Sequence, residues 1–119
     1  MTLEVLVTVC ALITVLILSG LALAFWTNPV RGMAQTTHRL ELLPLVMADR
    51  YTAFALIAVA ILFLGDLRLT AAFFAVCAFM GFADGLIYAR AGHPHMKHTF
   101  SGVLSVVALG VTLAALLAE

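Results

Sequence analysis

The chain has 119 residues, of which 65% are hydrophobic and 10% are charged, whereas a soluble domain is about half apolar and about a quarter charged. A soluble fold of this length cannot bury so much apolar surface, so the composition predicts an integral membrane protein. The formal net charge is zero and the six Lys and Arg are scattered singly, which excludes the basic patch that nucleic-acid binding needs.

Four apolar segments follow one another along the chain, and each reaches the roughly 20 residues that a helix needs to cross a bilayer. They cover about residues 3–26, 45–64, 69–89 and 99–118. None alternates with the period of two that marks a transmembrane strand, and four strands could not close a barrel. We therefore predict an all-α fold in which residues 1–119 form a single domain, an integral membrane antiparallel four-helix bundle.

The connections between these segments differ in length. Residues 27–44 form the longest polar stretch, and residues 38–43 within it mix charge with leucine, so we expect them to lie along the headgroup region before the chain turns inward at Pro44. Whether this stretch covers a site as a lid stays open. Residues 65–68 are too few for anything but a tight antiparallel hairpin, so the second and third segments should be neighbours.

Cationic residues near the segment ends predict how the protein lies in the membrane. Five of the six lie in or beside the first and third connections: Arg31, Arg39, Arg50, Arg90 and Lys97. Only Arg68 lies in the middle hairpin. Because cytoplasmic loops carry the excess of Lys and Arg, we expect both termini on the non-cytoplasmic side of a multi-pass protein of the plasma (inner) membrane, with Trp26 and Tyr88 at the cytoplasmic interface.

Two ionisable residues fall inside predicted helices at the same depth. At a rise of about 1.5 Å per residue, Asp84 lies roughly 22 Å from the start of segment 69–89, and Arg50 lies roughly 21 Å from the end of segment 45–64. Each costs about 2.5–3.5 kcal/mol on insertion scales and therefore calls for a partner or a purpose. Asp84 and Arg50 are thus expected to be level on adjacent helices, where they can form an ion pair.

The third segment carries a stripe of small and polar residues. Cys77, Gly81, Asp84 and Tyr88 recur at spacings of four, three and four, which place them on one face of a helix. Gly81 and Gly85 also form a small-xxx-small pattern, which lets helix backbones approach closely. We expect this face to point into the bundle.

Polar groups of the fourth segment reach the same layer, because Ser101 and Ser105 come out at about the depth of Asp84, with His98 at the membrane boundary. A histidine close to a carboxylate is an acid–base couple that operates near neutral pH. We take Asp84, His98 and Arg50 as candidate catalytic residues. The candidate ligand-binding residues are Tyr51, Tyr88, Ser101 and Ser105.

These residues predict a protein that binds a small lipophilic molecule in an intramembrane pocket near the cytoplasmic side. Chemical transformation of the bound molecule is an extension of this prediction. The expected partner is membrane lipid, and no cofactor is expected. An alternative from another class is a structural or oligomeric membrane protein, in which the ion pair only fixes helix register and small residues drive homo-oligomerisation. A small transporter is a further alternative. It needs polar access from both sides, yet the outer half offers few polar groups.

Three histidines within six residues, His93, His95 and His98, raise the question of a metal. Pro94 breaks their helical presentation, and no Cys or carboxylate accompanies them locally. We therefore predict no metal site.

Three sequence stretches carry a family resemblance: residues 49–56, 81–85 and 98–102. With an Arg that opens the second segment, an Asp late in the third and a His that opens the fourth, the chain resembles small four-helix membrane proteins of unknown function that are similar to DoxX-like proteins. The resemblance covers roughly the last 70 residues and implies a fold without an activity. Its motif positions are Arg50, Asp84 and His98.

A second resemblance concerns residues 38–44, which look like the connection between the first two helices of glutathione-handling four-helix membrane enzymes. It implies a glutathione-dependent membrane enzyme as an alternative. Those enzymes have an Asn between the His and the Glu of this region, and no Asn lies between His38 and Glu41 in this chain.

Overall fold

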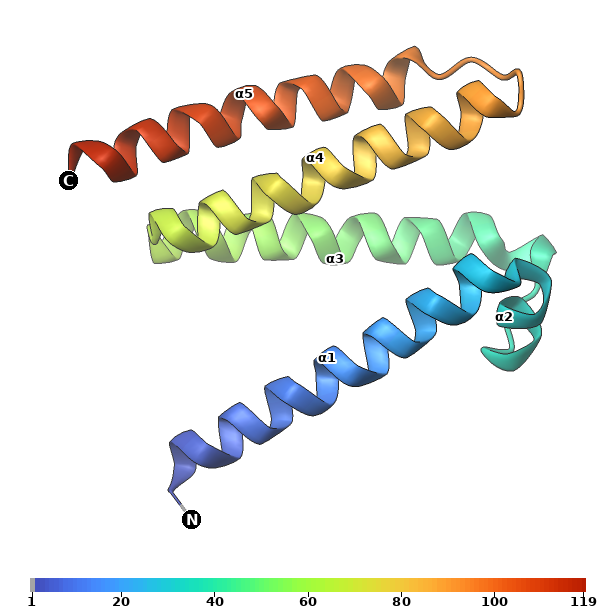
Figure 1. Ribbon diagram of the computed structural model, residues 1–119, viewed down its shortest axis with the longest axis horizontal. Coiled ribbons are helices and arrows are strands. Elements are labelled where there is room, and N and C mark those ends of the chain that lie inside the picture. Colours follow the sequence, from blue (N-terminus) through green and yellow to red (C-terminus); the bar gives the residue numbers. More distant parts are fainter. Residues whose placement is uncertain (1) are drawn as a thin grey trace. The chain divides into compact units, whose positions relative to one another are not determined.

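The computed structural model of the chain describes residues 2–119, which are helical apart from short connections. In chain order the elements are α1 (Leu3–Thr27), α2 (Pro29–Gln35), the 3-10 helix η1 (Leu40–Leu42), α3 (Leu43–Leu64), α4 (Leu67–Arg90) and α5 (Met96–Ala118) (Figure 1). The prediction of an all-α fold with four long apolar helices is confirmed, and each helix boundary lies within three residues of the predicted one. All four long helices are long and apolar enough to cross a membrane.

The chain divides into two compact units, one that ends at Arg50 and a second that comprises Tyr51–Glu119. The positions of the two units relative to one another are not determined. Each unit is therefore described on its own.

The first unit is built around the end of α1. Asn28 ends this helix with a backbone N–H that donates to the carbonyl of Ala24 (3.0 Å), and its side-chain oxygen accepts from the backbone N–H of Arg31 (3.0 Å) to begin α2. Pro29, with its fixed φ, occupies the first turn of α2. Gly32 is buried, and a Cβ there would lie 3.0 Å from the ring of Phe25, so α2 folds back onto α1.

The connection over residues 27–44 is therefore more ordered than the sequence predicted. We predicted a polar connection and named no helix within it, whereas α2 and η1 occupy ten of its residues, seven and three respectively. The local signals were present, because an Asn followed by Pro is an N-cap followed by a favoured first helical residue. Because α2 is short and has no long apolar run, a prediction based on the length of apolar segments does not detect it.

In the second unit, the turn between α3 and α4 consists of two residues with separate roles. Gly65 ends α3 with a φ of +64°, which favours glycine. Asp66 caps α4, because its carboxylate accepts from the backbone N–H groups of Arg68 (2.8 Å) and Leu69 (3.1 Å).

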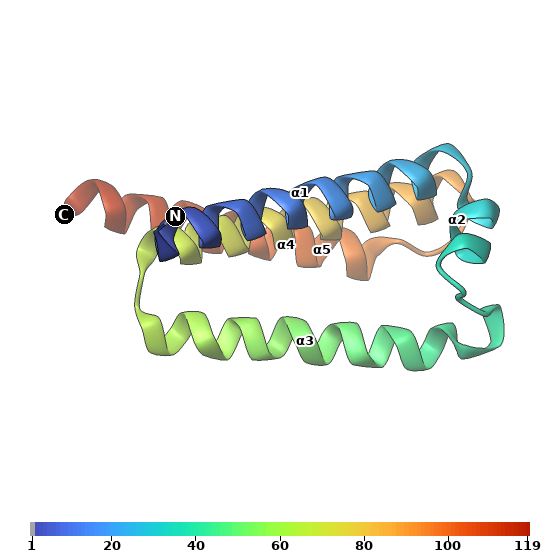
Figure 2. The same ribbon diagram turned by 90° about the horizontal axis from the view of Figure 1, so that it is seen from below.

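Close packing in this unit joins α4 to α5, which lie side by side in both views (Figure 1); Figure 2 shows the pair from below. The short linker predicted the second and third long helices as neighbours, but the close contacts are between α4 and α5, and none of the described residues of α3 is buried. A short linker brings two helix ends together. It does not supply two faces that fit each other along their length.

The contact between α4 and α5 is made by small residues. A Cβ at Gly81 would lie 2.5 Å from the backbone nitrogen of Gly102 and 3.0 Å from the carbonyl of His98, so the two backbones touch. One turn on, a Cβ at Gly85 would lie 2.6 Å from Oγ1 of Thr99. The small-xxx-small spacing of Gly81 and Gly85 thus predicted a packing face correctly, and α5 is the helix that it meets.

Large apolar side chains remain exposed along all four long helices, for example Leu16 on α1, Leu62 on α3, Phe79 on α4 and Leu117 on α5. Among the described residues, the buried hydrophobic ones are the small Ala71 and Ala78. Helices that are apolar all round need an apolar solvent, because water would penalise this surface by about 25 cal/mol per Å². The chain has four candidate membrane-spanning helices, as a multi-pass membrane protein does.

Candidate functional site

The last turns of α4 and the first turn of α5 bring an acid and a base together. Nδ1 of His98 lies 3.7 Å from Oδ2 of Asp84, and this contact is an ion pair when the imidazole is protonated. The side chains are 35% and 47% exposed, respectively, so the hairpin itself does not enclose them. The sequence predicted His98 and Asp84 as an acid–base couple with His98 at the membrane boundary, and in the structure the two side chains face each other.

Tyr88 joins this pair from α4. Its ring stacks on the His98 imidazole with centroids 4.8 Å apart and an interplanar angle of 12°. Tyr88 follows Asp84 by one helical turn and so lies on the same face of α4. We call Asp84, Tyr88 and His98 the acid–base cluster.

The backbone of α4 and α5 fixes the positions of the cluster. The Gly81 contact with Gly102 and the Gly85 contact with Thr99 hold the two helices at one register close to Asp84. A buried small-residue contact tolerates little sliding, because any shift puts a side chain against the facing backbone. The ion pair is therefore not needed to set the register of this helix pair.

The turn between the helices is equally well defined. The carbonyl of Tyr88 accepts from the N–H of His93 (2.9 Å), and that of Ala89 accepts from the N–H of Gly92 (3.1 Å). With Gly92 at a φ of +75°, these bonds form a Schellman motif, which ends α4 at a defined residue. Tyr88 thus contributes its carbonyl to the turn and its ring to the cluster.

The cluster combines a carboxylate, an imidazole and a phenol. Nδ1 of His98 faces Asp84, and its Nε2 makes no hydrogen bond among residues 2–119. This nitrogen can exchange a proton or a hydrogen bond with a ligand, while Asp84 orients the ring from the other side. The phenolic hydroxyl of Tyr88 supplies a second donor or acceptor. The arrangement suits a molecule with a polar head group.

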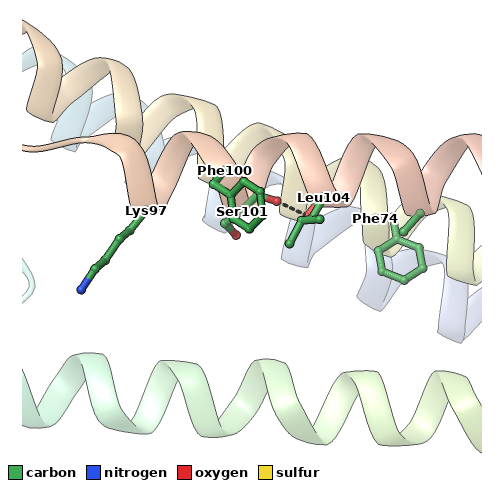
Figure 3. A pocket seen from close by; sticks show the side chains of 7 residues that line it. Phe74, Lys97, Phe100, Ser101 and Leu104 are labelled. Atoms are coloured by element: carbon green, nitrogen blue, oxygen red, sulfur yellow. Dashed lines mark hydrogen bonds between the residues drawn. The ribbon is translucent and has the colours of Figure 1, made fainter.

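Ser101 and Ser105, two of the predicted ligand-binding residues, lie elsewhere on the hairpin. They line an open groove of about 380 Å³ along α5, which we call the α5 groove (Figure 3). Its lining residues are Phe74, Lys97, Phe100, Ser101, Leu104, Ser105 and Ala108. The acid–base cluster does not contribute to this lining. The structure thus divides the predicted site into two places.

Arg50 and Tyr51 lie on α3, where one unit ends and the other begins. Tyr51 is exposed, and its hydroxyl makes no hydrogen bond within residues 2–119. The pairing of Arg50 with Asp84, which belong to different units, stays a prediction. Equal depth along two helices does not ensure contact, because each helix must also be rotated so that the two side chains face each other.

The remaining histidines of the turn do not gather around a metal position. Within residues 2–119 there is no group of three His, Cys, Asp or Glu side chains that could hold an ion. His95 instead points at its own helix, with Nδ1 3.1 Å from Oγ1 of Thr99. The Thr99 hydroxyl also donates to the carbonyl of His95 (3.2 Å).

Comparisons with family models, with curated proteins and with solved structures give no match for this chain. The function of the chain must therefore be inferred from the geometry of the α4–α5 hairpin and the chemistry of its residues.

Proposed function

We propose that the protein crosses the membrane four times through α1, α3, α4 and α5 as an antiparallel bundle, and that it binds a small lipophilic molecule at the acid–base cluster. In this proposal both termini lie on the non-cytoplasmic side of the plasma (inner) membrane. The turn between α4 and α5 then faces the cytoplasm, and the cluster lies near the cytoplasmic boundary of the bilayer. The orientation follows the excess of Lys and Arg in the first and third connections.

The observation that carries this proposal is the accessible carboxylate–imidazole pair with the stacked phenol. Ionisable groups in or near hydrocarbon are costly, and they usually mark a functional site or a structural partnership. Gly81 and Gly102 already set the register of α4 and α5 through backbone contact, so the pair of Asp84 and His98 is not needed for it. The alternative in which Asp84 and Arg50 fix the register of α3 and α4 remains a separate prediction. Groups that are one third to one half exposed also add little to packing.

The ligand that fits this chemistry has an apolar body and a hydroxyl, carbonyl or other polar head group. The head group would bind Nε2 of His98 or the hydroxyl of Tyr88, and the apolar body would remain in the lipid phase. If the bound molecule is transformed, the step that the cluster supports is proton transfer through His98, with Asp84 stabilising the protonated imidazole. In the assembled bundle, Arg50 would approach Asp84 from α3.

The test is mass spectrometry of small molecules that remain bound after gentle purification. We expect a defined lipophilic compound in the wild-type protein, and its loss from the Asp84→Asn and His98→Gln variants. Glu4→Gln, which alters an exposed carboxylate in the first turn of α1, is the matched control and should retain it. Equal ligand content in all four proteins would contradict the proposal.

A second candidate is a structural protein that self-associates through small residues. Gly110 in α5 favours this candidate. Glycine inside a helix costs about 0.5–1 kcal/mol relative to alanine, yet no contact within the described chain requires it, because a Cβ at this position would meet open space. A helix from another copy could pack there. This candidate predicts that Gly110→Leu lowers the oligomeric state in detergent while the content of bound small molecules is unchanged.

A further inference from the structure

The α5 groove is a second site candidate, separate from the acid–base cluster. Six of its seven lining residues come from α5, and Phe74 comes from α4. Figure 3 shows Lys97 at one end and Phe74 at the other, with Phe100, Ser101 and Leu104 between them. The groove has a volume of about 380 Å³ and is open along its length.

The chemistry of the groove changes along its length. Lys97 at one end is cationic, and among residues 2–119 no carboxylate pairs with it. One turn further, Ser101 presents a hydroxyl, while Ser105 donates its own hydroxyl to the Ser101 carbonyl at 2.9 Å. The rest of the lining is apolar or small. The charge therefore lies at one end of the groove, and the two serines lie among apolar side chains beyond it.

The length of the groove matches one leaflet of a bilayer. Lys97 and Ala108 are eleven residues apart, which corresponds to about 16 Å along the helix axis. Half of a hydrocarbon core of about 30 Å is about 15 Å. A molecule with its head at Lys97 and its tail at Ala108 would thus extend through one leaflet.

We propose that the α5 groove binds one anionic glycerophospholipid of the leaflet in which Lys97 lies. Its phosphate pairs with the Lys97 ammonium, and an ester carbonyl accepts from the Ser101 hydroxyl. One acyl chain lies along Phe100, Leu104 and Phe74. This inference depends on the membrane placement given above and not on the ligand of the acid–base cluster.

Charge complementarity favours this occupant. In the proposed orientation Lys97 lies at the cytoplasmic surface, where anionic lipids are concentrated and one Lys contributes about 1 kcal/mol of attraction. Free phosphate would leave the apolar part of the groove unused.

The experiment uses the full-length protein in nanodiscs that contain phosphatidylglycerol and phosphatidylcholine with identical acyl chains. Native mass spectrometry after release from the nanodisc gives the ratio of the two lipids that stay bound. We expect phosphatidylglycerol to be enriched on the wild-type protein. Lys97→Gln should lower this enrichment about five-fold, which is the effect of one charge worth about 1 kcal/mol.

Two matched controls separate the groove from general surface effects. Arg90→Gln removes a cation at the same end of the hairpin, outside the groove lining, and should leave the enrichment unchanged. Leu104→Trp fills the groove and should reduce retention of both lipids, whereas Val107→Trp changes another exposed residue of α5 outside the lining and should not.

The inference is overturned if Lys97→Gln keeps the wild-type enrichment, or if Arg90→Gln lowers it equally. It is also overturned if Leu104→Trp changes the oligomeric state and leaves lipid retention intact, because the groove is then a contact between copies. The small-molecule content of the same samples reports separately on the acid–base cluster. The failure of either proposal can thus be recognised without the other.

Discussion

The backbone nitrogen of Gly102 lies so close to Gly81 that a Cβ on the latter would be only 2.5 Å away from it. This contact joins α4 to α5 without any large side chain, and it lies within two turns of both Asp84 and His98. The helix pair therefore presents its acid–base cluster on a frame that packs independently of the cluster. Substitutions in the small-residue contact and in the acid–base cluster should therefore have different effects on stability and on ligand binding.

Gly81→Ala should destabilise the hairpin. The added methyl group meets the backbone of Gly102, which cannot rotate away as a side chain can, so the helices must separate. Overpacking of this kind costs typically about 1–3 kcal/mol, and the melting temperature of the protein in detergent measures it. Gly110→Ala adds the same methyl group in open space and should be neutral or stabilising. Equal melting temperatures for the two variants would argue against close packing at Gly81.

Asp84→Asn should change stability little. Its pair with His98 is partly exposed at 3.7 Å, and exposed ion pairs contribute about 0–1 kcal/mol. Chemical unfolding in mixed micelles measures this difference. A loss above about 3 kcal/mol, as expected when a buried pair is broken, would instead favour the register-fixing role and count against a binding site.

Substitutions of Tyr88 should separate the ring from the hydroxyl. Tyr88→Phe keeps the stack on His98, so the ring-current shift of the His98 imidazole protons in NMR spectra should persist while ligand content falls. Tyr88→Leu removes the stack, and the shift should disappear with a loss of about 0.5–1.5 kcal/mol. A His98 shift that is unchanged in Tyr88→Leu would show that the rings do not stack.

Gly92→Val should loosen the turn before α5. Gly92 has a φ of +75° in the Schellman motif that ends α4, and this region costs a residue with a side chain about 1–2 kcal/mol, most of all a β-branched one. Gly92→Asn, which tolerates the left-handed region better, should lose less. Hydrogen exchange of the His93 amide, which is bonded to the Tyr88 carbonyl, should be faster in the Val variant than in the Asn variant.

The proposed orientation can be tested by thiol labelling in a background without Cys10 and Cys77. A membrane-impermeant maleimide added to spheroplasts should label Glu119→Cys, whereas His93→Cys should react only after the membrane is opened. His93 lies in the turn between α4 and α5, and Glu119 follows the end of α5. If His93→Cys alone were labelled in intact spheroplasts, the orientation would be the opposite of the proposed one.

The sequence by itself determined the four long apolar helices. Each reaches the length that a bilayer requires, and a backbone in an apolar medium can satisfy its hydrogen bonds within one such segment. The ends of α4 also carry local signals that the prediction of residues 69–89 did not use, namely Asp66 as a cap and Gly92 as a left-handed terminus. Asp84 stood out as a candidate site residue because a carboxylate in an apolar helix is costly wherever the helix packs.

Only the tertiary structure decided which helices meet. The depth of Asp84 could be counted along α4, but its partner depended on how the small face around Gly81 fits Gly102, a match between residues far apart in the chain. That match brought His98 to Asp84 and Tyr88 and left Ser101 and Ser105 in a separate groove. Helix formation depends on local backbone bonds, whereas pairing depends on the shapes of two surfaces, which periodicity alone does not describe.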